Sequence, residues 1–102
     1  MSAIIPKKAL ESMLITAVAD SASILSPGIP LKVTTALTPS GMLYYALVVT
    51  PKNAERETSR WRVEDKGPPV PTDKLGEALG RRRALEALLE QLERKVGKEL
   101  LG

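Results

Sequence analysis

The sequence predicts an α+β protein with an N-terminal helix, a three-stranded antiparallel sheet, a proline-rich linker and a long C-terminal helix. Three observations predict this class: helical spacing of apolar residues near both ends, alternating strand-like runs between them, and turn residues at each junction. The 102 residues suffice for one small domain, and 43% hydrophobic residues beside 26% charged ones favour folding over disorder.

The first predicted element is a helix from Lys7 to Leu25. Its apolar residues recur at helical spacing and form one stripe, as a helix with one buried face requires. Pro6 suits a first helical turn. Ser26-Pro27-Gly28 is predicted to end the helix, because proline cannot continue a helix and glycine is common just after its end. We expect the apolar stripe to pack on a neighbouring sheet.

Two strand-like runs follow, from Leu31 to Thr38 and from Met42 to Thr50. Pro39-Ser40-Gly41 between them has the composition of a type I turn followed by a glycine bulge, which is the common three-residue hairpin loop. Such a loop fixes the register of the hairpin. Ala36 then faces Tyr44 across the two strands.

This register divides the hairpin into two faces. Tyr44 shares one face with Thr34 and Lys32, and we expect this more polar face to be open to solvent. The other face is almost wholly apolar and should pack on the N-terminal helix; it consists of Leu31, Val33, Thr35, Leu37, Leu43, Tyr45, Leu47 and Val49. A register shifted by one residue would exchange the two faces, and the tyrosines with them.

A third strand is predicted from about Glu57 to Val63. Alternation places Trp61 with Val63 on one side, and Arg60 with Arg62 on the other. Burying two arginines costs more free energy than burying a tryptophan, so we expect Trp61 and Val63 in the core and the arginines on the open face. The alternative is that both arginines are ordinary solvated residues, paired with neighbouring glutamates.

A proline-rich linker, residues 67–72, is predicted to separate a body of residues 1–66 from a helix of residues 73–102. Its prolines can continue neither a helix nor a central strand. At about 1.5 Å per residue, a helix from Asp73 to Leu101 is roughly 43 Å long, which exceeds the width of a body of this size.

The predicted overhang indicates that a partner covers the apolar stripe of the last helix. Its leucines follow the spacing of a coiled-coil seam over a short stretch, which favours self-association into a homodimer or higher oligomer. The alternative is that the helix folds back and buries its stripe in the same chain. The candidate oligomerisation residues are Leu85, Leu88, Leu89, Leu92 and Val96.

The predicted open face combines positive charge with an aromatic ring. Cations neutralise a phosphate backbone and flat side chains stack on any base, which is how proteins bind single-stranded DNA or RNA without sequence preference. The candidate nucleic-acid-binding residues are Lys32, Tyr44, Lys52, Arg56, Arg60, Trp61 and Arg62, with Trp61 included for the case that it lies at a sheet edge. The other interpretation is a self-associating scaffold or protein-binding regulator, including one of viral or plasmid origin.

The composition excludes several kinds of site. The chain has no His and no Cys, which removes zinc sites built on those ligands, thiol chemistry and histidine-activated nucleophiles. Its carboxylates are scattered, so we expect no catalytic residue, metal, cofactor or small-molecule substrate. No apolar run reaches the roughly 20 residues that span a bilayer, and no secretory signal precedes the first helix, so we expect a cytoplasmic protein.

The order of elements resembles the ThermoDBP-related proteins, which are single-stranded DNA-binding proteins of hyperthermophilic archaea. The resemblance covers the whole chain in architecture, size and composition, and it is carried by Arg60-Trp61-Arg62 and by the helix with Leu85, Leu89, Leu92 and Val96. It implies single-stranded DNA binding by an oligomer whose C-terminal helices join the subunits. One Asn, one Gln and no Cys are in keeping with a thermophilic source.

Overall fold

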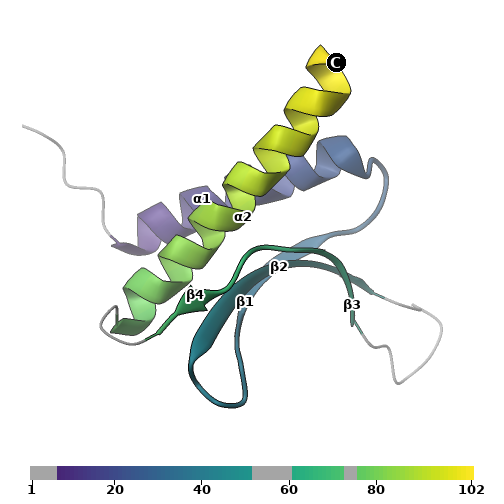
Figure 1. The fold of residues 1–102 in the computed structure, drawn as a ribbon. Helices are drawn as coiled ribbons and strands as arrows, with labels where there is room; N and C mark the ends of the chain where they lie inside the picture. Colours follow the sequence, from purple (N-terminus) through teal and green to yellow (C-terminus); the bar gives the residue numbers. More distant parts are fainter. Residues whose placement is uncertain (1–6, 52–60, 73–75) are drawn as a thin grey trace, which may run out of the picture.

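Helices and strands follow one another in the predicted order, with a short fourth strand added before the last helix, in the computed structural model, which describes residues 7–51, 61–72 and 76–102 (Figure 1). The two helices are α1 (Lys7–Leu25) and α2 (Gly76–Leu101). The strands are β1 (Lys32–Leu37), β2 (Leu43–Pro51), β3 (Trp61–Lys66) and β4 (Val70–Pro71). The predicted α+β class is confirmed, with an N-terminal helix, an antiparallel sheet and a long C-terminal helix.

Strand β2 is at the centre of the sheet. β1 pairs antiparallel with one of its edges, and β3 and β4 pair antiparallel with the other. Between β3 and β4 the chain stays beside β2, because the Gly67 amide donates to the Ala46 carbonyl at 3.0 Å. The Thr72 amide donates to the Met42 carbonyl at 3.0 Å. Residues 67–72, for which a linker is predicted, therefore lie along the edge of the sheet.

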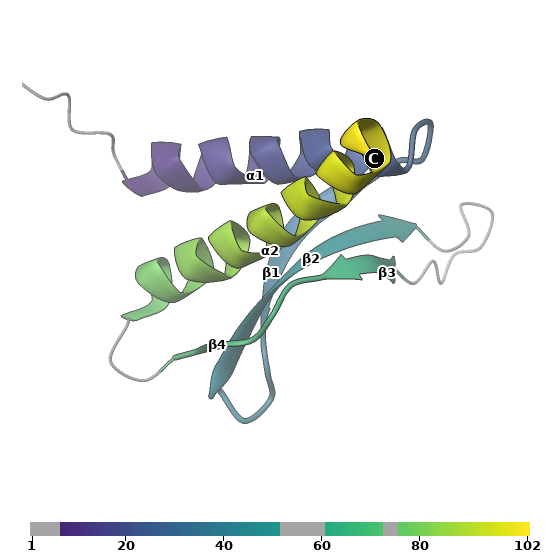
Figure 2. The same ribbon diagram turned by 45° about the horizontal axis from the view of Figure 1, so that its top comes forward.

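Both helices lie on the same side of the sheet (Figure 2). Helix α2 packs on β2, and α1 packs along α2 and also contacts β1. The core where they meet is formed by Val18 and Ala22 of α1, Tyr44, Ala46 and Val48 of β2, and Ala84, Leu85, Leu88 and Leu92 of α2. Helix α2 thus folds back and buries its apolar stripe in its own chain, which agrees with the alternative interpretation of that stripe.

The burial of α2 corrects the predicted coiled-coil seam. Leu85, Leu88 and Leu92 are at most 1% exposed, because α1 and β2 cover them within the chain. Leu89 is half-buried against the same core, and Val96 is half-buried nearer the end of the helix. The seam prediction is therefore wrong for the three fully buried leucines, which cannot contact a second copy.

Polar contacts also hold α2 against its neighbours. Arg81 Nε donates to Glu11 Oε1 of α1 at 3.1 Å, and Lys95 Nζ donates to Asp65 Oδ1 of β3 at 2.7 Å. Both pairs are partly solvent-accessible, so each contributes little to stability by itself. They fix the orientation of α2, because one pair joins α2 to α1 and the other joins α2 to the sheet.

The hairpin register differs by one residue from the prediction. Leu37 faces Tyr44, and the Thr38 amide donates to the Leu43 carbonyl at 2.9 Å, so the hairpin loop consists of residues 39–42 and has one residue more than predicted. The Gly41 amide donates to the Thr38 carbonyl at 2.8 Å and Gly41 has a φ of 74°, so the predicted turn is present. The loop nevertheless continues through Met42 before β2 begins. Every β2 side chain consequently lies on the face opposite to the predicted one.

The shifted register exchanges the two tyrosines. Tyr44 is 6% exposed and belongs to the core, although the prediction places it on the open face. Its ring packs against α2 at Gly80, where an added Cβ would come within 2.6 Å of a ring carbon. Tyr45 lies on the open face instead. The faces of β1 are as predicted, with Val33 packed on the core and Lys32 exposed.

Candidate nucleic-acid interface

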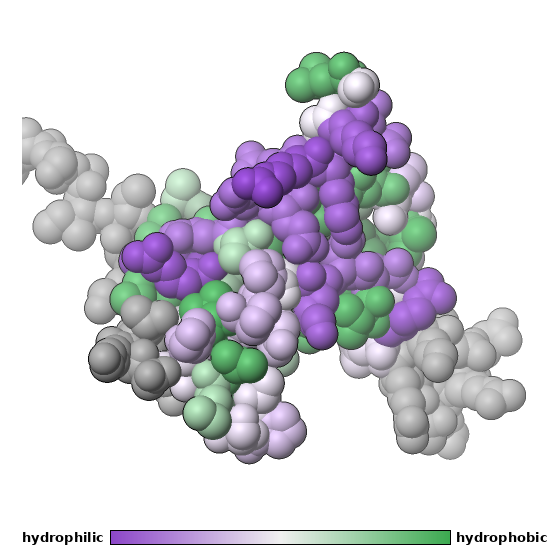
Figure 3. All heavy atoms as spheres, in the orientation of Figure 1, coloured by the Kyte–Doolittle hydropathy of each residue, from purple (hydrophilic) through white to green (hydrophobic). Residues whose placement is uncertain are grey.

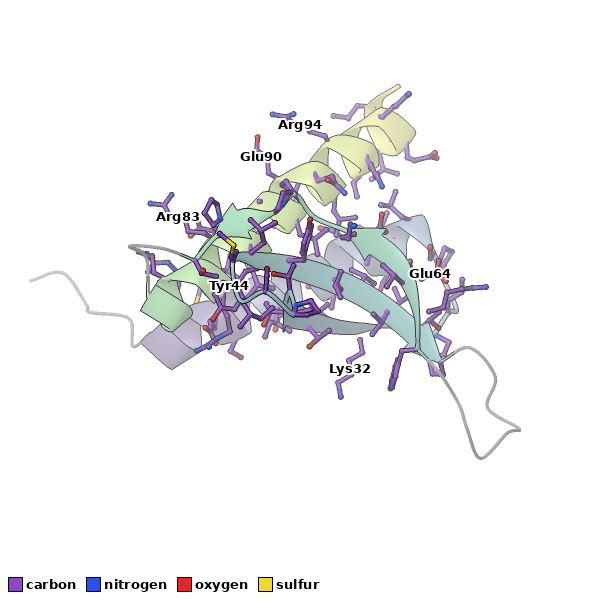
Figure 4. The ribbon with its side chains drawn as sticks, turned by 60° about the horizontal axis from the view of Figure 1, so that its bottom comes forward. Lys32, Tyr44, Glu64, Arg83, Glu90 and Arg94 are labelled. Carbon is purple, nitrogen blue, oxygen red and sulfur yellow. The ribbon has the colours of Figure 1, made fainter. Side chains whose placement is uncertain are left out.

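The side of the sheet away from the helices is formed by alternate residues of β1, β2 and β3. Lys32 extends from β1 away from the helices, whereas Tyr44 lies between β2 and α2 (Figure 4). We call this side the open face; it consists of Lys32, Thr34 and Ala36 of β1, Leu43, Tyr45, Leu47 and Val49 of β2, and Trp61, Val63 and Lys66 of β3. It presents aromatic rings and cations on one surface.

Each aromatic ring of the open face has a lysine beside it. Lys66 Nζ lies 4.7 Å from the centroid of the Tyr45 ring, and Lys32 Nζ lies 5.8 Å from the centroid of the Trp61 ring. Both distances are in the range of cation–π attraction. Positive charge and flat apolar surface therefore lie side by side at two places on the face.

The exposure of Trp61 and Val63 corrects the prediction that they join the core. They are 53% and 50% exposed, and they face Pro51 and Val49 of β2 on the open face. The prediction assumes that an exposed tryptophan forces the neighbouring arginines into the core. Strand β3 is at the sheet edge, however, and Arg62 stays accessible there with 59% of its side chain exposed.

Arg62 does not belong to the open face, contrary to the prediction. It faces Thr50 on β2, and its Nη2 donates to Glu64 Oε1 at 2.6 Å. For Arg62, this ion pair agrees with the alternative interpretation, in which a neighbouring glutamate neutralises the charge of the arginine. Asp65 is likewise paired, at 2.7 Å from Lys95. These two carboxylates of β3 are therefore engaged by cations.

Part of the predicted site is brought together by the fold. Lys32 and Trp61 share the open face and contact each other, whereas Tyr44 lies in the core and Arg62 on the other side of β3. Outside the described residues lie the candidates Lys52, Arg56 and Arg60. Two of the four placed candidates thus remain on the surface that carries the rings.

Sequence reasoning misses Tyr45 and Lys66 of the open face. A three-residue hairpin loop places Tyr45 in the core, and a third strand ending at Val63 leaves Lys66 out of the sheet. The sequence gives no signal that selects Tyr45, because a register shifted by one residue exchanges the two tyrosines and both sides of β2 are apolar. The sequence does not signal the pairing of β3 with β2 either. A bulge in β3, opposite Val48 and Val49, shifts the register partway along the strand.

Comparisons with protein-family models, curated proteins and solved structures found no match for this chain. Within residues 7–51, 61–72 and 76–102, no three acidic side chains gather closely enough to hold a metal ion. Over the same residues, neither helix combines the length and the apolar character that crossing a membrane requires. The open face is the feature of the described chain that offers a recognisable binding chemistry.

Proposed function

We propose that the protein binds single-stranded nucleic acid, DNA or RNA, through the open face without sequence preference, as a cytoplasmic homo-oligomer. The observation that supports this proposal is the pairing of Tyr45 with Lys66 and of Trp61 with Lys32 on one exposed surface. Aromatic rings accept any base by stacking, and lysines neutralise phosphates. The resemblance to the ThermoDBP-related proteins implies the same activity.

The shape of the open face favours single strands over duplexes. Rings that lie on a sheet can stack on bases only where those bases are unpaired and turned outward, as in sheet-based RNA-binding modules. In a duplex the bases are paired and stacked inside, so only the phosphates can contact the open face. Lysine is a compact point charge without the rigid fork of arginine, so the cations of this face suit the phosphates of any sequence.

A salt titration with labelled oligo-dT tests this proposal. We expect the single strand to bind more tightly than a duplex of equal length, with log K falling by about 0.7 per neutralised phosphate for each unit of log salt. Lys66→Ala should reduce this slope by about 0.7. Lys98→Ala, which removes an exposed lysine near the end of α2, is the matched control and should leave it unchanged. Absence of binding to any single strand at low salt would sink the proposal.

The end of α2 supports the homo-oligomer. Leu100 and Leu101 are 67% and 89% exposed at the end of α2, and Figure 3 shows hydrophobic atoms at the tip of this helix. A groove of about 340 Å³ beside this tip is lined by Ser21 of α1 and by Glu93, Val96, Gly97, Leu100 and Leu101 of α2. A second copy offers the same leucines and the same groove, so one two-fold contact can cover both.

Light scattering tests the oligomer. We expect the wild-type chain to be a dimer or larger, and the combined change Leu100→Ser and Leu101→Ser to make it monomeric. Met42→Ser is the control, because Met42 is 65% exposed in the hairpin loop, away from the groove. A monomeric wild type would contradict self-association. An oligomer that binds no nucleic acid would favour the scaffold or protein-binding regulator instead.

A further inference from the structure

Four side chains of the open face form a row along β2. Tyr45 belongs to β2 itself. The other three lie on neighbouring strands, beside later residues of β2: Lys66 opposite position 47, Lys32 opposite position 49 and Trp61 opposite position 51. The order along the strand is therefore ring, lysine, lysine, ring, with one lysine on β3 and the other on β1.

The two rings of this row are too far apart for neighbouring bases. The ends of the row are six residue steps apart on β2, from position 45 to position 51, and an antiparallel strand covers roughly 20 Å in six steps at about 3.4 Å each. Bases in a stacked strand follow one another at about 3.4 Å. A strand that places a base on each ring therefore needs about six nucleotide steps between them when it is stacked, and fewer when it is extended.

The lysines are placed to contact the phosphates of the steps between the rings. Each ammonium lies over the ring nearer to it, at 4.7 Å for Tyr45 and 5.8 Å for Trp61, and so occupies a surface that a base would use. An exposed cation–π contact is weak, and the lysine stem is flexible. An arriving base can therefore displace the ammonium, which then meets the phosphate next to that base.

We propose that a single strand lies along β2 with one base on Tyr45, a second base about three to six nucleotides further on Trp61, and the phosphates between them against Lys66 and Lys32. This inference rests on the proposed function and adds a defined spacing to it. Once one base is stacked, capture of the second base is intramolecular, which raises the affinity of strands long enough to reach both rings.

Ten-nucleotide DNA strands with thymine at only two positions and abasic sites elsewhere test the spacing at constant charge. Binding is followed by the fluorescence of Trp61, the single tryptophan of the chain. We expect thymines about three to six steps apart to bind at least about fivefold more tightly than adjacent ones, because only the former engage both rings. Tyr45→Ala should remove this optimum, whereas Met42→Ala in the hairpin loop should keep it.

The outcomes separate this inference from the function on which it rests. Equal binding at every spacing, together with ordinary binding of ten-nucleotide oligo-dT, would overturn the two-ring row and leave single-strand binding intact. A spacing optimum that persists in Tyr45→Ala would also overturn the row, because the second base would then lie elsewhere. Absence of binding to oligo-dT itself would overturn both the row and the proposed function.

Discussion

Replacing Tyr45 and Trp61 together by alanine is expected to weaken the binding of single-stranded oligo-dT by at least about thirtyfold. Stacking on an aromatic side chain is worth about 1–3 kcal/mol per base, and about 1.4 kcal/mol corresponds to a factor of ten. The fold should survive, because both side chains lie on the side of the sheet opposite to the core. The anisotropy of a labelled strand measures the loss.

The matched control for this change is the pair Tyr45→Phe and Trp61→Phe. Both replacements keep a flat ring on the open face, so the affinity should stay within a few-fold of the wild type. Circular dichroism of all variants separates loss of binding from loss of fold. A folded double-alanine variant with wild-type affinity would mean that the strand binds on another surface.

Gly80→Ala is expected to destabilise the protein by about 1–3 kcal/mol, although alanine is the better helix former. The added Cβ would lie 2.6 and 2.7 Å from two carbons of the Tyr44 ring. That ring is rigid and buried between β2 and α2, so it cannot swing aside as a flexible chain would. Each 1 kcal/mol shifts the Tm of a domain of this size by about 4–8 °C, which thermal unfolding resolves.

Gly97→Ala provides the control within the same helix. An added Cβ there meets nothing within 4 Å, so the substitution should stabilise the protein by about 0.5–1 kcal/mol when measured at low concentration, where association contributes little. Tyr44→Leu provides the second test, because it removes the ring that Gly80→Ala would strike. Combined, these two changes should cost less than the sum of their separate costs. Additive costs would contradict the assigned contact.

Helix α1 illustrates what the sequence can predict. Its predicted C-terminal bound, Leu25, agrees with the structure, and Lys7, the predicted first residue, is helical at the start of the described residues. The reason is that Ser26-Pro27-Gly28 ends a long periodic stripe, and the effect of the proline does not depend on tertiary contacts. Both ends of β1 and the start of β2 are likewise predicted to within one residue, since a turn with proline and glycine separates the two strands.

The register of the hairpin could not be predicted, because both sides of β2 are apolar. Alternation selects a register only where one side is polar, and neither the residues around Tyr44 nor those around Tyr45 provide that contrast. Loops of three and four residues also accept the same proline and glycine. Tertiary contacts decide between them: Tyr44 fits against Gly80, and Thr72 bonds to the Met42 carbonyl.

The candidate site inherits the error in register. Lys32 is predicted on the correct face because β1 has one polar side. The face of Tyr45 depends instead on which side of β2 packs on the helices, and that side is predicted wrongly. Trp61 is misplaced for a different reason. A comparison of burial costs within one strand cannot show that the strand is at an edge, where the tryptophan and Arg62 are both accessible to water.

The contact between the first and the last helix governs how a newly made chain folds. Glu11 and Arg81 form one ion pair across 70 positions of sequence, and Val18 and Leu88 share one core. Contacts this distant form slowly, because a long loop must close before they contribute. While α2 is still inside the ribosome, α1 and the helix side of β2 have no cover. We therefore expect the emerging chain to expose this apolar surface until α2 can pack on it.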